Sequence, residues 1–349
     1  AVPVIDEAKL PQHMYAMLAA TAGVTSVSVA GDTVDALPVM IPSTKSVFGE
    51  AHYSFTLAPT LGFDHAEATG AALPANYELA AWAPDALLGP AWPAIYAALG
   101  SAIHNDYPVI EGLLNAVHLD HSITLKYTPE QMLERGITTI DVTSHVAAVD
   151  ESSSGRIVTV ALELKANGEH VGSTQERFAI RGRATGNRTP SEAAPFGGAK
   201  VEVVDTPRSV LRRVSVKAPD DMTPFAIVSG DYNPIHTSYA AAKVAGMDAP
   251  LVHGMWLSAT AQHAAEAVVA GQGGAQIAGW TYYMYGTVDL NDEVEITVER
   301  VGRVVGGGLS LEVTCRINKQ VVSRASAYAF APKVAYVYPG QGIQSAGMG

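Results

Sequence analysis

One short segment of the sequence combines the residue types of an acid–base site. It spans residues 225–236, FAIVSGDYNPIH, and holds a carboxylate at Asp231 and an imidazole at His236. Because Pro234 disfavours the α conformation at Asn233, we expect a tight irregular loop that turns both side chains into one cleft. Near neutral pH such a pair can take a proton from one atom and deliver one to another. This chemistry suits the addition or elimination of water.

A second group of residues begins at His253, seventeen positions after His236. Gly254 and Met255 follow, and the Ala-rich segment 254–270 predicts a long helix. The first amides of a helix lack internal partners and carry the positive end of its dipole. The amide of Gly254 can therefore hold negative charge that grows on a thioester carbonyl oxygen, with no side chain in the way.

Each of these residues also has a structural alternative. Asp231 and His236 would then only form and close a turn. His253 would either line a substrate tunnel or support the helix start, and Gly254 would simply begin the helix. Other histidines lack a partner motif, and we expect core or surface positions for three of them: His104, His118 and His121.

The composition predicts a globular protein with one large core or two smaller ones. Of the 349 residues, 48% are hydrophobic and 16% are charged. The formal net charge of −12 disfavours non-specific binding to nucleic acid. Cys315 is the single cysteine and no spacing resembles a zinc site, so we expect no metal, and no motif implies another cofactor. With no apolar run of about 20 residues and no signal peptide, the sequence predicts a cytoplasmic protein.

The first half of the chain shows one buried helix among several strands. After a short helix at 10–22, alternating apolar residues and turn signals predict strands at 52–59, 118–128, 138–149, 158–164 and 170–180. Asn167-Gly168 supplies the turn of a hairpin. The segment 92–104 is apolar nearly all round, which predicts a buried helix.

The second half repeats this order. A segment rich in turn formers, 182–199, separates the halves and indicates a linker. Beyond it we expect helices at 238–244 and 254–270 and strands at 209–216, 276–289, 293–304 and 309–331, the last folded back near Asn318. The pattern predicts two copies of one α+β unit.

The two motifs together closely resemble the signature of the MaoC-like, or hydratase 2, branch of the hotdog superfamily. The residues that carry the resemblance are Gly230-Asp231-x-Asn233-Pro234-x-His236, Ala242 and Val252-His253-Gly254-Met255. It implies interconversion of (3R)-hydroxyacyl and trans-2-enoyl thioesters, with Asp231 and His236 as catalytic residues and Gly254 in the oxyanion hole. Members often carry a hydroxyl residue near the position at which this chain has Gln262, so the chain departs from the family pattern there. The implied fold is α+β, a double hotdog of two antiparallel sheets, each wrapped around a long central helix.

The end of the chain carries another resemblance. Residues 338–342, YPGQG, and 347–349, GMG, resemble the opening of malonyl/acyl transferase domains. A double hotdog followed by the start of an acyltransferase resembles the dehydratase region of a microbial type I fatty acid synthase. They imply a lead-in at 1–45, a non-catalytic hotdog at 46–183 that lacks D-x-N-P-x-H, a linker at 184–200, a catalytic hotdog at 201–333 and a truncated acyltransferase start at 334–349.

The resemblance implies dehydration of (3R)-hydroxyacyl-ACP to trans-2-enoyl-ACP during fatty acid chain elongation. His236 would take the α proton and Asp231 would help to protonate the departing hydroxyl, although coupled groups leave the reverse allocation open. Expected substrate contacts are Asn233, His253, Met255, Trp256 and Tyr283. Further candidates for an apolar tunnel wall are Leu257, Trp280 and Tyr282.

The expected partners are those of a synthase. They are an acyl carrier protein with its phosphopantetheine-linked acyl chain, the other synthase domains and a homo-oligomeric assembly. Two alternatives remain at this point. One is a (3R)-specific enoyl-CoA hydratase with the same site, and the other is a non-catalytic acyl-binding or scaffold module.

Overall fold

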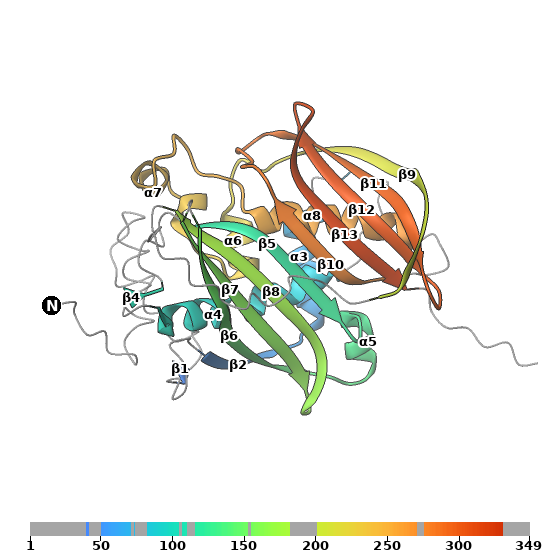
Figure 1. Ribbon diagram of the computed structural model, residues 1–349, viewed down its shortest axis with the longest axis horizontal. Coiled ribbons are helices and arrows are strands. Elements are labelled where there is room, and N and C mark those ends of the chain that lie inside the picture. The colour runs from blue at the N-terminus through green and yellow to red at the C-terminus, as the bar shows by residue number, and fades with distance from the viewer. Residues whose placement is uncertain are drawn as a thin grey trace, which may run out of the picture.

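The computed structural model describes residues 40–41, 50–70, 73, 82–104, 107–109, 116–152, 155–181, 201–270 and 276–330. Eleven strands form one antiparallel sheet, with helices against one of its faces (Figure 1). No helix in these ranges is long and apolar enough to cross a membrane. The helix predicted at 10–22, the linker at 184–200 and the transferase-like segment at 334–349 lie outside the described residues.

The two halves of the chain each supply one side of this sheet. Its order is β1-β2-β6-β7-β8-β5-β10-β13-β12-β11-β9. The first half contributes β1 (Met40–Ile41), β2 (Glu50–Thr56), β5 (Ala116–Leu125), β6 (Thr139–Ser152), β7 (Gly155–Ala166) and β8 (Glu169–Arg181). The second half contributes β9 (Val203–Lys217), β10 (Gln276–Met284), β11 (Glu293–Val304), β12 (Leu309–Ile317) and β13 (Gln320–Phe330). Where the sequence predicts one sheet for each half, these eleven strands of both halves form a single sheet, because β5 pairs with β10 and Ile123 lies opposite Trp280.

Both predicted hairpin turns are present. Asn167 and Gly168 connect β7 to β8 with φ values of 50° and 81°. Asn318 and Lys319 connect β12 to β13 with φ values of 49° and 70°. Positive φ at both central residues matches the right-handed twist of the flanking strands, which is why Asn and Gly favour this turn.

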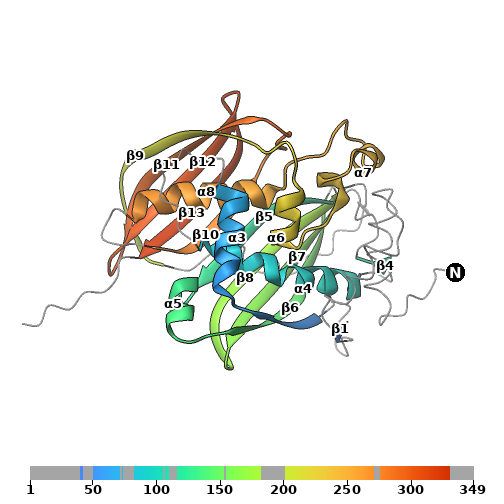
Figure 2. The same ribbon diagram turned by 180° about the vertical axis from the view of Figure 1, so that it is seen from behind.

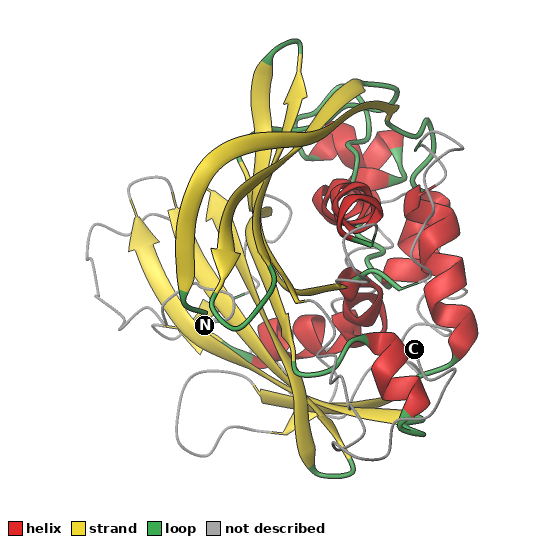
Figure 3. Cartoon of the chain, turned by 90° about the vertical axis from the view of Figure 1, so that its right-hand side faces the viewer, coloured by secondary structure: helices red, strands yellow, loops and turns green. Residues whose placement is uncertain are grey.

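Two long helices lie on the concave side of the sheet (Figures 2 and 3). Helix α4 (Leu88–Ser101) contacts β2, β6 and β7, and α8 (Gly254–Val269) contacts β9, β10, β11 and β12. Each half therefore wraps its strands around one buried helix. Between them lie α3 (Pro59–Gly70), α6 (Thr223–Ser229) and the 3₁₀ turn η2 (Pro84–Leu87). These elements pack against the long helices and hold the halves together.

The remaining elements are short. They are β3 (Ile103–His104), paired with β4 (Tyr107–Pro108), α5 (Pro129–Glu134), the 3₁₀ turn η4 (Pro234–His236) and α7 (Tyr239–Val244). Helix α5 follows β5, whereas η4 and α7 follow α6 and precede α8. The segment between α6 and α8 therefore carries both motifs that the sequence singled out.

Candidate active site

A cavity of about 160 Å³ lies where the two halves of the chain meet. The loop after α6 and the start of α8 line one side of it, with Asp231, His236 and Gly254. The other side belongs to the first half and includes Tyr96 of α4 and His118 of β5. The site is therefore composite, and neither half encloses it alone.

The local sequence explains the loop that carries the acid–base pair. Helix α6 ends at Gly230, whose φ of 68° is a left-handed conformation that glycine adopts without strain. Asp231 then accepts a hydrogen bond at Oδ1 from the amide of Asn233 at 3.1 Å. The Asn233 side chain accepts one from the amide of Ile235 at 3.3 Å, which caps the η4 turn begun by Pro234. The predicted tight irregular loop is confirmed.

Asp231 is a carboxylate in the resting site. Its Oδ1 also accepts a hydrogen bond from the Tyr96 hydroxyl at 2.6 Å. Burial would raise the pKa of Asp231, but the nearby His253 and His236 rings and the Tyr96 hydrogen bond hold that pKa below its ordinary value. The group is therefore an ionised proton acceptor at neutral pH.

His236 is oriented as a neutral base. Its Nδ1 donates a hydrogen bond to the carbonyl oxygen of Leu251 at 2.8 Å, since that oxygen can only accept. Nε2 is then the basic nitrogen of the ring. Burial lowers the pKa of His236 below its ordinary value, against the opposing attraction of Asp231. The ring is neutral near pH 7 and can take up a proton there.

His253 supports both members of the pair. Its ring stacks on that of His236, with centroids 3.8 Å apart and planes at 26°. Its Nε2 donates to the backbone carbonyl of Asp231 at 3.1 Å. Burial, and then the neighbouring His236, lower the pKa of His253 to about 3, so this ring stays neutral. His253 thus combines the two roles that the sequence leaves open, since it lines the cavity and braces the loop.

Asp231, His236 and His253 also have the composition of a metal site. Their potential ligand atoms all lie within 4.8 Å of one another. A metal ion needs lone pairs that converge on one point. The near-parallel stacking of the two imidazoles directs their nitrogens along two separate planes. This geometry suits proton transfer better than coordination.

Gly254 is the first residue of α8 and lines the cavity. Among the described residues, none of the backbone hydrogen bonds outside regular helices and strands uses its amide, as expected for the first position of a helix. A Cβ at this position would lie only 2.4 Å from Sδ of Met284. Glycine therefore lets Met284 close the cavity wall while the amide stays accessible.

Residues 199–320 match the family model described as a MaoC like domain. This segment is a MaoC-like domain. It contains Asp231, His236 and Gly254, which are the residues that carry the motif resemblance.

Similar proteins point to the same domain. Over 140 residues the chain is 31% identical to the fatty acid synthase beta subunit stcK of Emericella nidulans, covering 39% of this chain and 7% of that protein. Over 133 residues it is 34% identical to the beta subunit TOXC of Cochliobolus carbonum, covering 38% and 6%. These matches span less than a tenth of either relative. A solved MaoC-like dehydratase from Phytophthora capsici, 14% identical, superposes with a TM-score of 0.57 over 81% of this chain and 96% of that one. The chain thus has a hotdog-type fold.

The MaoC-like domain brings most of the predicted contacts to the cavity. Asn233, His253 and Met255 line it, as do Leu257 and Tyr282. Trp256, Trp280 and Tyr283 are not among the residues that line it. The indole N–H of Trp256 instead donates to the carbonyl of Ala68 on α3 at 3.0 Å. Neighbouring strand residues face opposite sides of a sheet, so Tyr282 and not Tyr283 faces the helices and the cavity.

Two polar residues of the first half belong to the site although no motif marks them. Tyr96 bonds to Asp231, and His118 lines the cavity where the sequence predicts an ordinary core or surface position. Trp92 and Phe178 contribute aromatic wall beside them. Tyr96 and His118 reach the cavity only because the two halves contact each other, and that contact leaves no local pattern in the sequence.

Proposed function

We propose that this chain catalyses the reversible dehydration of (3R)-hydroxyacyl thioesters to trans-2-enoyl thioesters. The observation that carries the proposal is one cavity lined by a neutral imidazole at His236, a carboxylate at Asp231 and Gly254, the first residue of α8. The MaoC-like domain and the fatty acid synthase relatives support this class of reaction. The double-hotdog arrangement, with units at 46–183 and 201–333, belongs to the same proposal.

The reaction needs a base, a proton donor and a stabilised enolate oxygen. His236 takes the C2 proton at Nε2, and the electron pair of the C2–H bond forms the C2=C3 double bond. The C3–O bond breaks with its electrons on oxygen, which receives a proton from the coupled Asp231–His236 pair and leaves as water. The pair gains one proton and gives up one, so it returns to its starting state. The amide of Gly254 holds the thioester oxygen as negative charge develops on it.

We further propose that the thioester is carried by an acyl carrier protein. The relatives are named as beta subunits of fatty acid synthases, and such a subunit would place this chain beside other synthase domains in an oligomeric assembly. An enoyl-CoA hydratase would use the same site in the opposite direction. Comparing kcat/KM for crotonyl thioesters of CoA, pantetheine and carrier protein separates the two, because only a synthase enzyme should prefer the carrier.

The central experiment follows water addition to crotonyl pantetheine through the loss of ultraviolet absorbance of the enoyl thioester. We expect measurable hydration by the wild-type chain and a loss of about 10²- to 10⁴-fold in Asp231→Asn and His236→Ala. His145→Gln is the matched control, because His145 is an exposed position on β6. Absence of hydration by the wild-type chain, or unchanged rates in both site variants, would favour a non-catalytic acyl-binding module.

A further inference from the structure

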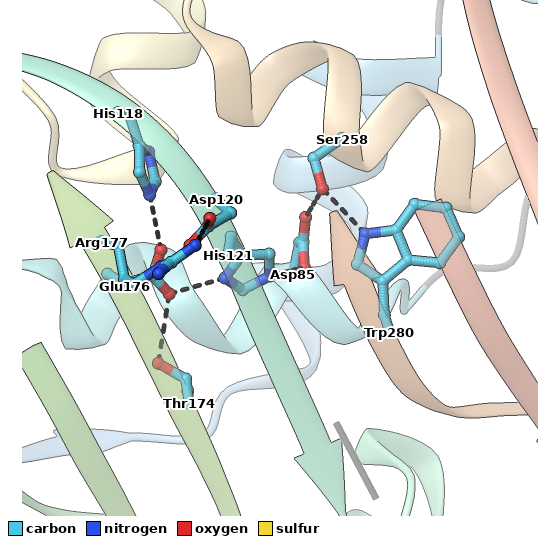
Figure 4. Close-up of polar contacts among 9 residues, drawn as sticks. All are labelled: Asp85, His118, Asp120, His121, Thr174, Glu176, Arg177, Ser258 and Trp280. Carbon is cyan, nitrogen blue, oxygen red and sulfur yellow. Dashed lines mark hydrogen bonds and ion pairs between the residues drawn. The ribbon is translucent and has the colours of Figure 1, made fainter. Parts of the chain in front are cut away.

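A chain of polar groups runs from Asp85, at the contact between the halves, to His118, which lines the cavity (Figure 4). It begins at Asp85 of η2, which accepts hydrogen bonds from Ser258 at 2.7 Å and from Gln262 at 2.6 Å, both on α8. His121 of β5 follows, with Nε2 2.8 Å from Oδ1 of Asp85 and Nδ1 2.6 Å from Oε1 of Glu176 on β8. Asp85, His121 and Glu176 are all buried.

The charges of this chain follow from its hydrogen bonds. Burial would lower the pKa of His121, but Glu176 and Asp85 raise it to about 10. Burial would raise the pKa values of Asp85 and Glu176, yet His121 lowers both of them. The trio therefore consists of two carboxylates and one imidazolium, with one negative charge in excess. Its outer end, Oε2 of Glu176, accepts a hydrogen bond from the next group.

That next group is His118, whose Nε2 lies 2.8 Å from Oε2 of Glu176. Its ring stacks on Phe178, with centroids 4.6 Å apart and planes at 22°. These two contacts fix both the plane of the ring and the nitrogen that faces the core. A carboxylate only accepts, so Nε2 carries a proton and Nδ1 is the nitrogen left for another partner.

His118 also belongs to the wall of the cavity. Its side chain is 14% exposed, and the ring lines the same space as Asp231 and His236. No hydrogen bond among the described residues involves its Nδ1, and this atom is not among the fully buried unpaired ones. An oriented nitrogen without a partner in the described part of the chain therefore borders the place where the reaction is proposed to occur.

We propose that His118 is a substrate-binding residue supplied by the first half, whose Nδ1 hydrogen-bonds the hydroxyl or water oxygen of the reaction, and that Glu176 is its positioning residue. The inference rests on the proposed dehydratase function and assigns to the predicted non-catalytic unit a direct contact with substrate. The inference also assigns a role to the buried trio of Asp85, His121 and Glu176. Asp85 and His121 hold Glu176 in place, and Glu176 holds the His118 ring in one tautomer.

Two substitutions of His118 separate its two nitrogens. In His118→Gln the amide nitrogen can replace Nε2 as the donor to Glu176, but nothing replaces Nδ1. In His118→Asn a polar atom remains near the position of Nδ1, whereas the donor to Glu176 is lost. We expect His118→Gln to melt like the wild-type chain and to raise KM for (3R)-3-hydroxybutyryl pantetheine about tenfold. We expect His118→Asn to be less stable and closer to wild type in KM.

A purely structural role for His118 predicts the reverse order. His118→Gln would then keep wild-type kinetics, and that result would overturn the inference. The exposed control His145→Gln should change neither melting nor KM. Glu176→Gln provides a second check, since a loosened His118 ring should raise KM even where the fold persists. If KM is unchanged in a folded Glu176→Gln protein, its positioning role is wrong.

The pH dependence gives a readout that stability does not affect. Two titratable groups act on the pKa of His236: Asp231, which raises it, and His118, which lowers it. The His118 ring is one of the groups that lower the pKa of His236, so His118→Gln should raise that pKa and move the acid limb of kcat/KM to higher pH. An unmoved acid limb, together with unchanged KM, would place His118 outside the working site.

Failure of the proposed function can be told apart from failure of this inference. A wild-type chain that does not hydrate crotonyl pantetheine contradicts the function. Calorimetric titration with (3R)-3-hydroxybutyryl pantetheine still tests His118 in that case. Binding that weakens about tenfold in His118→Gln and not in His145→Gln supports the contact. Equal binding by the wild-type chain and both variants overturns it.

Discussion

The hydroxyl of Tyr96 lies 2.6 Å from Oδ1 of Asp231, although the two residues are 135 positions apart in the sequence. Tyr96 is on α4 of the first half, and Asp231 follows α6 in the second. This hydrogen bond fixes the carboxylate and helps to keep its pKa low. The half that lacks the D-x-N-P-x-H motif therefore contributes, after His253 and His236 of the other half, to keeping the proposed catalytic residue Asp231 ionised.

We predict that Tyr96→Phe lowers kcat about tenfold, because a hydrogen bond to a charged group stabilises it by about 1.5–3 kcal/mol. The pKa of Asp231 should rise, since one of the groups that lower it is lost. The matched control is Tyr232→Phe, which removes an exposed hydroxyl one residue from Asp231. Steady-state hydration of crotonyl pantetheine measures both variants. Equal rates in the two would show that Tyr96 only packs.

The amide of Gly254 can be removed without removing the helix. Proline is accepted at the first position of a helix, where the missing N–H has no internal partner. The preceding residue, His253, already has φ −60° and ψ 129°, a conformation that proline allows. If the amide holds the enolate oxygen, Gly254→Pro should lower kcat by about 10²-fold or more.

Gly254→Ala is the control for this change, because it adds the Cβ that crowds Met284 but keeps the N–H. We expect a smaller loss in Ala than in Pro, and the difference between them measures the amide. Circular dichroism should show the same helix content in both proteins. Equal losses would mean that crowding by Cβ explains the defect and that the amide has no special part.

The sequence predicted the strands and the acid–base loop because their causes are local. The hairpins depend on Asn167 and Asn318, which tolerate positive φ, and on alternating apolar residues beside them. Gly230 and Pro234 bend the loop in the same local way. Helix α5 has such a signal too, a capping box between Thr128 and Gln131, but its six residues are too few for a periodic pattern.

Other features depend on contacts between distant segments and have no local signal. Helix α3 has no clear apolar stripe, and its packing against α6 and α8 places it. His118 reaches the cavity because β5 pairs with β10 and joins the halves in one sheet. Ser258, one turn before Gln262 on α8, supplies the hydroxyl that bonds to Asp85. A motif-based interpretation could therefore find the residues of the second half but not their partners in the first.

The pKa of His236 makes a signed prediction about pH. Burial lowers this pKa below 6.5, so the base is neutral at pH 7 and kcat/KM should fall only at lower pH. Asp231 opposes that shift by attracting the imidazolium. In Asp231→Asn the pKa of His236 should fall further, and the residual activity should hold to lower pH than in the wild-type chain. A pH–rate profile whose acid limb moves upward in this variant would contradict the assignment of His236 as the base.

The buried imidazolium at His121 predicts how stability depends on pH. Its pKa is about 10 in the folded chain and 6.5 as the ordinary value, so its contribution is complete below pH 6.5 and is lost as pH rises through about 10. His121→Gln leaves Asp85 and Glu176 without their cation, and we expect it to lower the free energy of unfolding by about 3–5 kcal/mol at pH 6. Urea unfolding at pH 6, 8 and 10 should show that the difference in the free energy of unfolding between variant and wild type becomes smaller as pH rises. For the exposed control His145→Gln, this difference in the free energy of unfolding should be small and constant. A difference for His121→Gln that stays constant from pH 6 to 10 would mean that His121 is neutral in the folded chain.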